Sequence, residues 1–216
     1  MMDARKQSAM GSKAHWEQLY QLKRPTEVSW YTPHLDASLK LLGRAGLCPE
    51  SRVVDVGGGA STLVDDLLDH GITQISVLDI SGQALAASQA RLGVRAVQVD
   101  WIEGDVTQAQ LPRHHYDIWH DRAVFHFLTS PEHRRRYTET ASEALKPGGQ
   151  CIIATFSLQG PPRCSGLEVV RYSPETLLAE LGHGFRLVES LDEAHRTPFN
   201  TVQHFAYCRF QKASSP

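Results

Sequence analysis

Carboxylates and glycines in the first half of the chain are spaced as a nucleotide-type ligand would need them. Asp55 lies in the apolar stretch 53–56, and three glycines, 57–59, follow it directly. Asp79 ends the next apolar stretch, twenty residues after Gly59. An acid at that distance can accept hydrogen bonds from both hydroxyls of a ribose, and glycines let the backbone approach a ligand closely. Together these residues indicate a site for an adenosine-containing cofactor.

A second group of polar side chains follows the apolar stretch that begins at Tyr116. It contains His120 and Asp121, with His126 a few residues later. A carboxylate can orient an amine, and a histidine can accept a proton near neutral pH. We therefore predict that His120, Asp121 and His126 are catalytic. Packing in the core is the competing interpretation of His126.

These side chains need a sheet whose strands end at one common edge. Val53, Val54 and Val56 would be buried on both faces, which is typical of a parallel strand, and Ser61 or Thr62 can cap the helix that follows. The apolar pattern predicts further strands at 74–79, 94–101, 116–121, 150–156, 185–191 and 200–210. The last two are separated by too few residues for a crossover helix, so they must pair antiparallel. The sequence thus predicts βα units that end in a hairpin.

The bulk composition excludes several classes of function. The chain has 216 residues, 41% of them hydrophobic, which suits one globular domain. Its formal charge of −2 gives no reason to expect a nucleic-acid partner. No apolar run approaches the ~20 residues of a membrane span, and the start of the chain has no signal-peptide pattern. The four cysteines form no Cys-x-x-Cys pair, so we expect no metal site and a reducing, cytoplasmic location.

The pattern resembles the class I, seven-stranded S-adenosylmethionine-dependent methyltransferases over residues 15–210. The resemblance is carried by Asp55-Val-Gly-Gly-Gly59, Asp79, Gly104-Asp-Val106 and Leu145-Lys-Pro-Gly-Gly149, while Ser61 stands where the family commonly has a third glycine. It implies a doubly wound, Rossmann-like α/β fold with strand order 3-2-1-4-5-7-6 and strand 7 antiparallel. Together with the polar start of the chain and the helical pattern before the first strand, it predicts three parts: a disordered tail (1–13), an N-terminal helical lid (14–46) and the cofactor-binding methyltransferase domain (47–212).

The resemblance assigns roles to the cofactor-binding residues. Asp55 and the glycine turn would face the methionine part of S-adenosylmethionine, and Asp79 would hold the ribose hydroxyls. Ile80 would lie against the adenine, whose amine and ring would bond to Asp105 and Val106. The full predicted set for the cofactor, and for its product S-adenosylhomocysteine, is Asp55, Gly57, Gly58, Gly59, Asp79, Ile80, Gly104, Asp105, Val106 and His120.

The acceptor side has a narrower, partial resemblance. Asp121-Arg-Ala-Val-Phe125 looks like the Asp-Lys-Gly-Thr-Phe/Leu stretch of a group of protein-lysine methyltransferases in this class. The segments 16–20 and 28–31 resemble the aromatic entry segment of the same group. The predicted substrate pocket is Trp16, Tyr20, Trp30, Tyr31, Arg122 and Arg171, with Arg163, Cys164 and Tyr172 as further candidates. Within the lid, residues 14–34 are expected to become ordered on binding.

The identity of the methyl acceptor stays open in the sequence. An amine, on a protein lysine or a small molecule, is favoured, and a small-molecule thiol is the alternative. Two interpretations of other classes are a nicotinamide-dependent oxidoreductase that uses the glycines and Asp79, and a non-catalytic methyltransferase-like subunit. We expect a small-molecule or protein acceptor as partner, with neither nucleic acid nor membrane involved. The oligomeric state cannot be predicted from these residues.

Overall fold

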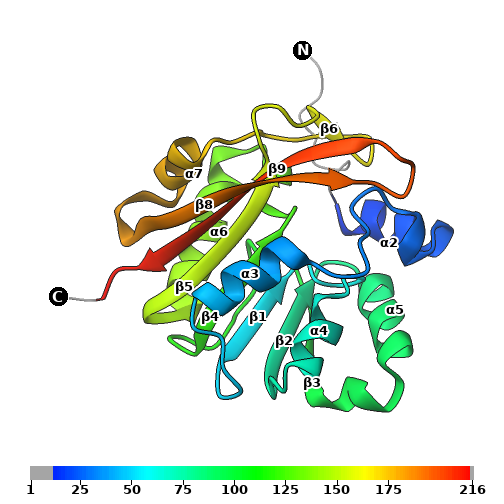
Figure 1. Ribbon diagram of the computed structural model, residues 1–216, viewed down its shortest axis with the longest axis horizontal. Coiled ribbons are helices and arrows are strands. Elements are labelled where there is room, and N and C mark those ends of the chain that lie inside the picture. The colour runs from blue at the N-terminus through cyan, green and yellow to red at the C-terminus, as the bar shows by residue number, and fades with distance from the viewer. Residues whose placement is uncertain (1–11, 215–216) are drawn as a thin grey trace.

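A single seven-stranded sheet forms the centre of the protein (Figure 1), for which a computed structural model describes residues 12–214. The strand order is β3-β2-β1-β4-β5-β9-β8, and β9 runs antiparallel to both of its neighbours. The strands are β1 (Arg52–Val56), β2 (Gln74–Asp79), β3 (Val99–Glu103), β4 (Tyr116–Arg122), β5 (Leu145–Phe156), β8 (Phe185–Arg196) and β9 (Val202–Lys212). Because β6 (Arg163–Cys164) and β7 (Leu167–Glu168) form a separate ribbon, β8 and β9 are the sixth and seventh strands of the sheet. The predicted fold and strand order are confirmed.

Helices cover both faces of the sheet, which explains why β1 is apolar on both sides. Against one face pack α3 (Asp36–Arg44), α4 (Leu63–Asp69) and α5 (Gly82–Leu92). Against the other pack α6 (Pro131–Ala144) and α7 (Pro174–Leu181). Val53 belongs to the first core cluster and Val54 to the second, as the alternation of side chains along a strand requires.

Several predicted boundaries were wrong. The predicted strand 94–101 begins only at Val99, because residues 93–98 form the 3₁₀ helix η2, on which Val94 and Val97 are 90% and 88% exposed. The strand predicted at 150–156 begins five residues earlier, at Leu145. β8 is longer than predicted and β9 lies two residues later, because their ladder continues from Phe185 opposite Lys212 to Arg196 opposite Val202.

The N-terminal segment divides into two parts with different packing. The helix α2 (Lys13–Leu22) and the 3₁₀ helix η1 (Pro25–Glu27) lie over the carboxyl edge of the sheet, whereas α3 buries Leu41 and Leu42 in the core. The predicted lid 14–46 therefore includes one helix, α3, that is part of the packed sheet domain. Of the predicted tail 1–13, residues 1–11 lie outside the described part of the chain, and Lys13 begins α2.

One carboxylate attaches α2 to the sheet domain. Glu17 accepts hydrogen bonds from the backbone N–H groups of Gly82 (2.7 Å) and Gln83 (3.3 Å), at the first turn of α5. The amide groups at a helix N-terminus have no partners inside the helix and carry a partial positive charge, so an acidic side chain is stabilising there. Within residues 12–214, no helix has the length and apolar character needed to cross a membrane.

Candidate active site

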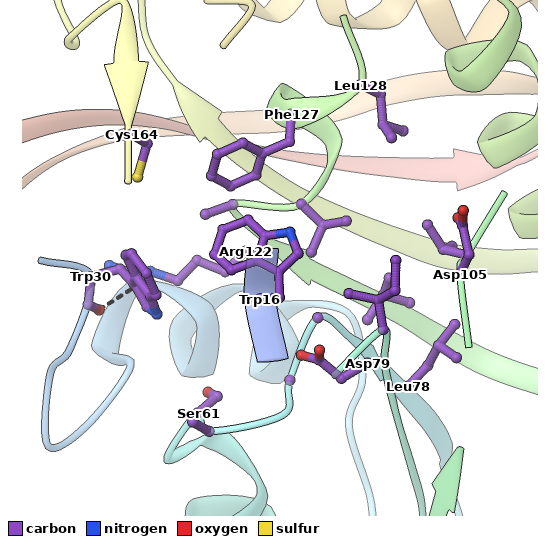
Figure 2. Close-up of a pocket in the computed structure, with 18 of the residues that line it drawn as sticks. Trp16, Trp30, Ser61, Leu78, Asp79, Asp105, Arg122, Phe127, Leu128 and Cys164 are labelled. Atoms are coloured by element: carbon purple, nitrogen blue, oxygen red, sulfur yellow. Dashed lines mark hydrogen bonds between the residues drawn. The ribbon is translucent and has the colours of Figure 1, made fainter. Parts of the chain in front are cut away.

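A cavity of about 1230 Å³ lies at the carboxyl edge of the sheet, beneath the N-terminal segment. Most of the predicted cofactor and substrate residues line it: Asp55, Gly57, Gly58, Asp79, Ile80, Gly104, Asp105, Val106, His120, Trp16, Tyr20, Trp30, Tyr31 and Arg122. The predicted residues that do not line it are Gly59, Asp121, His126 and Arg171. The cavity has two ends in Figure 2, with Trp16, Trp30, Phe127 and Cys164 at one end, and Leu78, Asp79 and Asp105 at the other.

Two glycines of the turn after β1 are required for different reasons. Gly57 has a φ of +68°, and a Cβ there would lie 2.0 Å from Val124 Cγ2. A side chain at Gly57 would therefore be strained as well as crowded. Gly59 faces away from the cavity, because a Cβ there would lie 2.5 Å from the Cβ of Ala84 on α5. Its absence from the cavity wall corrects the predicted contact, and its glycine identity is explained by close packing of the turn on α5.

Asp79 ends β2 with both carboxylate oxygens turned towards the glycine turn and α5. One oxygen accepts from the Gly59 N–H at 2.9 Å, and the other from the Ser81 N–H at 2.8 Å. Burial raises the pKa of Asp79 to about 6, even though the two hydrogen bonds act in the opposite direction. Each carboxylate oxygen keeps acceptor capacity beyond these bonds, so Asp79 can still accept hydroxyl donors from a ligand.

Asp105 and its neighbours form the polar rim at the same end. One Asp105 oxygen accepts from both the backbone N–H and the hydroxyl of Thr107, each at 2.8 Å. This is a local turn that fixes the carboxylate at the cavity wall. Glu103 is ion-paired with Lys13 of α2, so the N-terminal segment closes over this rim as well.

His120 and Asp55 form a buried pair beneath the cavity floor. His120 Nδ1 donates to an Asp55 oxygen at 2.7 Å, and His120 Nε2 lies 2.8 Å from the hydroxyl oxygen of Ser38 on α3. The side chains of His120 and Asp55 are 1% and 3% exposed. Both ring nitrogens of His120 are occupied, so this ring orients Asp55 rather than standing free as a base.

Asp121 does not reach the cavity, contrary to its predicted role in orienting the acceptor. Its carboxylate is fully buried and accepts from the Tyr137 hydroxyl (2.6 Å) and from the backbone N–H groups of Val124 (2.9 Å) and Phe125 (3.1 Å). The physical reason is the alternation along β4, which turns Asp121 towards α6 when His120 faces α3. Asp121 therefore stabilises the turn after β4, and burial raises its pKa to about 6.

His126 is also placed in the core, which corrects its prediction as a proton acceptor. Its Nδ1 accepts from the backbone N–H of Phe156 at 3.2 Å, and its ring lies between Phe127 and Phe156, with centroids at 4.5 and 4.6 Å. Burial lowers the pKa of His126 to about 3, so the ring is neutral at physiological pH. His126 is therefore a packed core residue, as the competing interpretation of the sequence has it.

The aromatic end of the cavity is built from two distant parts of the chain. Trp16 of α2 packs edge-on against Phe127 and Trp30, with ring centroids at 5.0 and 6.1 Å. Tyr20 and Tyr31 line the same cavity. Edge-to-face contacts of this kind stabilise aromatic clusters beyond the area that they bury. The predicted pocket wall of N-terminal aromatic residues is thus assembled around Phe127, a residue of the 3₁₀ helix η3 (Phe125–Phe127).

Arg122 connects this aromatic end to the terminal hairpin. Its Nη1 donates to the Trp30 carbonyl (2.9 Å), its Nε donates to the Tyr207 hydroxyl (2.7 Å), and its Nη2 lies 3.8 Å from a Glu193 oxygen. The guanidinium also stacks over the ring of Phe205 at 4.8 Å. A buried positive charge with these partners is held firmly at the cavity wall.

The loop after β5 contributes fewer contacts than predicted. Arg171 is exposed, and its guanidinium donates to the carbonyls of Leu158 (3.1 Å) and Gly160 (3.3 Å), so it braces the loop outside the cavity. Arg171 therefore does not line the predicted substrate pocket. Its hydrogen bonds stabilise the loop to which Arg171 belongs.

The β6–β7 ribbon brings two of the further candidates to the cavity. Arg163 and Cys164 line it, and burial raises the pKa of the Cys164 thiol to about 11, so this thiol is protonated at neutral pH. Tyr172 instead packs in the core against Phe125. Across residues 12–214 no three His, Cys, Asp or Glu side chains come together in a group that could hold a metal ion.

The comparison with known proteins agrees with this geometry. Residues 53–149 match the methyltransferase domain family. This part of the chain is therefore similar to a methyltransferase domain. The matched residues include the glycine turn, Asp79 and Asp105. The match agrees with the predicted resemblance to methyltransferases, and it leaves the methyl acceptor open.

Individual relatives of this methyltransferase domain are distant. The chain is 25% identical over 153 residues to the eEF1A lysine and N-terminal methyltransferase of Mus musculus, which covers 68% of this chain and 22% of that protein. It is 22% identical over 200 residues to the human EEF1A lysine methyltransferase 2, covering 85% and 78% of the two chains. The chain thus spans only about a fifth of the mouse relative.

A solved structure supports the fold. The 1,6-didemethyltoxoflavin-N1-methyltransferase of Burkholderia thailandensis, with bound 1,6-didemethyltoxoflavin and S-adenosylhomocysteine, superposes with a TM-score of 0.74. The identity is 18%, and the alignment covers 99% of this chain and 92% of that chain. This likeness establishes the same fold.

Sequence reasoning missed three residues of the site. Ser38 contacts His120, Glu17 holds α2 in place, and Phe127 completes the aromatic wall. Ser38 lies three and four residues before Leu41 and Leu42 on one helix face, so helical spacing would have placed it on the buried side. The partner of Glu17 is 65 residues away, and no local pattern identifies it.

Proposed function

We propose that this methyltransferase domain transfers the methyl group of S-adenosylmethionine to an amine nitrogen held at the aromatic end of the cavity. The observation that carries the proposal is the enclosure formed by Trp16, Trp30 and Phe127 next to the polar end. Aromatic faces attract a cationic amine and exclude water from the reacting atoms. The mouse and human relatives, named as lysine methyltransferases, and the N1-methyltransferase of Burkholderia thailandensis support nitrogen as the acceptor.

The residues at the polar end fit the cofactor. One Asp55 oxygen is buried and has no hydrogen-bond partner among the described residues, so an ammonium group next to it would relieve an unfavourable burial. Asp79 can accept the two ribose hydroxyls, and Asp105 can accept from the adenine amine. Ile80 and Val106 line the cavity between them as apolar surface for the adenine ring.

Methyl transfer requires the protein mainly to position the acceptor and to exclude water from the site. When bound, S-adenosylmethionine supplies a methyl group on a positively charged sulfur, which is already activated for displacement. The protein residues then align the acceptor and exclude water. Trp16 and Phe127 form the wall against which the acceptor lies, and the Glu17 carboxylate keeps Trp16 in place by attaching α2 to α5.

Proton removal from the amine has to be explained without the predicted bases. Asp121 and His126 lie in the core, and both nitrogens of His120 are engaged. An alkyl ammonium has an ordinary pKa near ~10.4, and both burial and a neighbouring positive charge lower it. The Arg122 guanidinium at the cavity wall and the aromatic enclosure act in that direction, so the amine can enter the reaction in its neutral form.

The lid proposal applies to residues 14–34 and leaves α3 in the sheet domain. Within this segment α2 is attached by Glu17 and Lys13, and residues 29–30 are attached by His195 and Arg122. Polar contacts of this kind can be broken at a smaller cost than the core contacts of Leu41 and Leu42. We infer that acceptor entry requires displacement of α2. We also infer a reducing, cytoplasmic location, because all four cysteines are free.

A small-molecule thiol is the second candidate acceptor, and Arg122 is the observation in its favour. A thiol has an ordinary pKa near ~8.5, and a positive charge at the cavity wall favours the reactive thiolate. The two acceptors differ in pH dependence. With an amine, kcat/KM is expected to rise over the whole range from pH 7 to 10, whereas with a thiol it should level off earlier.

The deciding experiment uses S-adenosylmethionine labelled in its methyl group. The purified protein is incubated with extract of its source cells, and label is measured separately in protein and small-molecule fractions. We expect label on nitrogen in one of these fractions, and much less label when an Asp79→Asn variant is used. Label on sulfur would replace the amine proposal by the thiol, and cofactor binding without any transfer would indicate a non-catalytic subunit.

Replacement of Asp79 by Asn is expected to weaken cofactor binding strongly. The change removes one acceptor oxygen and the charge, and hydrogen bonds to a charged group contribute about 1.5–3 kcal/mol each, which corresponds to roughly ten- to a hundredfold in affinity. Calorimetric titration with S-adenosylhomocysteine measures the effect. Asp192→Asn is the matched control, because Asp192 is exposed on β8 outside the cavity. Equal affinities in the two variants would remove Asp79 from the site.

A further inference from the structure

We propose that Ser38 and His120 are positioning residues for Asp55, which they hold beneath the glycine turn at the amino-acid end of the cofactor site. The proposal rests on the proposed cofactor binding, and it assigns a function to α3 that neither the family match nor the fold gives. Ser38, His120 and Asp55 form a chain of two hydrogen bonds, 2.8 and 2.7 Å long, that runs from α3 through β4 to β1.

The direction of these hydrogen bonds is fixed by chemistry. A carboxylate only accepts, so His120 Nδ1 carries the hydrogen that is donated to Asp55. In the neutral ring Nε2 is then an acceptor, and it receives the hydroxyl hydrogen of Ser38. Asp55 thereby selects the tautomer of His120, and Ser38 helps to hold the plane of its ring. All three side chains are shielded from water, with Ser38 and His120 at 0% exposed and Asp55 at 2%.

Only one of the two Asp55 oxygens takes part in these hydrogen bonds, and the other lies next to the glycine turn. While the first oxygen is bonded to His120, the second is buried and has no hydrogen-bond partner among residues 12–214. A Cβ on Gly58 would lie 2.2 Å from that second oxygen, so the carboxylate sits directly under the turn that lines the cavity. The orientation of Asp55 therefore decides where negative charge stands at the turn.

The three residues of this hydrogen-bond chain stand on packed elements of the core, as a positioning role requires. Ser38 stands on the same face of α3 as Leu41 and Leu42, which are fully buried in the core. Asp55 and His120 occupy paired positions on the neighbouring strands β1 and β4. A hydroxyl held on such a face cannot easily be replaced by water, so its loss leaves His120 Nε2 without a partner.

The test compares two ligands that differ in the amino-acid part. S-adenosylhomocysteine contains it, whereas 5′-methylthioadenosine keeps the adenosine and lacks the amino-acid chain. For Ser38→Ala we expect the affinity for S-adenosylhomocysteine to fall roughly five- to tenfold, the range of one net hydrogen bond, and the affinity for methylthioadenosine to stay unchanged. Calorimetry gives both values, and it needs no turnover.

Further variants separate positioning from a general effect on folding. His120→Asn keeps an amide donor near the position of Nδ1 and should retain most of the selectivity for S-adenosylhomocysteine, whereas His120→Ala should lose it. Thr155→Val is the matched control, because it removes a hydroxyl that is equally buried and has no partner in the described chain. Its ratio of the two affinities should equal that of the wild type.

The outcomes distinguish the two proposals. If Ser38→Ala lowers both affinities equally, or neither, the positioning role is overturned while cofactor binding stands. If the wild-type protein binds neither ligand, the proposed function itself fails. If His120→Ala does not fold, Ser38→Ala and His120→Asn still decide the question.

Discussion

The wild-type protein is expected to lose about 3 kcal/mol of stability relative to an Asp121→Asn variant as the pH rises from about 4 to above 6. Burial raises the pKa of Asp121 to about 6 from 3.8, and each unit of pKa corresponds to about 1.4 kcal/mol. The folded state holds the proton more tightly than the unfolded state does, so deprotonation favours unfolding. The loss is absent at low pH, where Asp121 is protonated in both states, and complete above the folded pKa. The amide in the variant cannot ionise and has no such dependence.

Urea unfolding of both proteins at several pH values measures this difference, in which the contributions of other ionisable groups cancel. Tyr137→Phe is an informative control, because it keeps the carboxylate and removes the 2.6 Å hydrogen bond that stabilises its charged form. Its pH-dependent loss should extend to higher pH than that of the wild type. Parallel curves for wild type and Asp121→Asn would mean that Asp121 ionises normally. That result would contradict the burial of Asp121. Asp121 would then again be a candidate for contact with the acceptor.

Trp16→Ala is expected to lower kcat/KM about a hundredfold, because a displacement of about 1 Å between reacting groups can cost that much. Trp16 contacts Phe127 and Trp30 across the aromatic end of the cavity, and its removal opens this end to water. Affinity for S-adenosylhomocysteine should change far less, since Trp16 packs against the aromatic rings of Phe127 and Trp30. The thermal midpoint should fall only slightly, because α2 buries none of its residues completely.

Two control variants test whether the aromatic wall itself is responsible. Trp16→Phe keeps an aromatic ring and should recover much of the activity. Leu22→Ala alters the same helix at a position that is 75% exposed and outside the cavity, and it should behave as wild type. Steady-state kinetics with the acceptor identified by labelling gives kcat and KM for each variant. Normal turnover by Trp16→Ala would show that the proposed lid does not shape the acceptor site.

The part of the site that depends on connections between consecutive elements could be predicted from the residues alone. A strand, a glycine turn, a helix and a second strand place Asp55, the turn and Asp79 at one edge, because parallel strands joined by helices end on the same side. The hydrogen bond from the Gly59 N–H to Asp79 spans only 20 residues. The antiparallel hairpin was equally predictable, because its connection is too short for anything else.

The orientation of the polar residues of β4 could not be predicted in this way, because it depends on the packing of helices against the sheet. Alternation predicts that His120 and Asp121 face opposite sides, but it does not say which side is the cavity. That depends on which helix covers each face, and here α3 brings Ser38 to His120 from 82 residues away, while α6 brings Tyr137 to Asp121. The same holds for Trp16 and Phe127, which meet where Glu17 and Lys13 attach α2 to the sheet domain. Contacts between distant segments follow from the packing of the whole chain, so local patterns could name the residues of the acceptor end but not their partners.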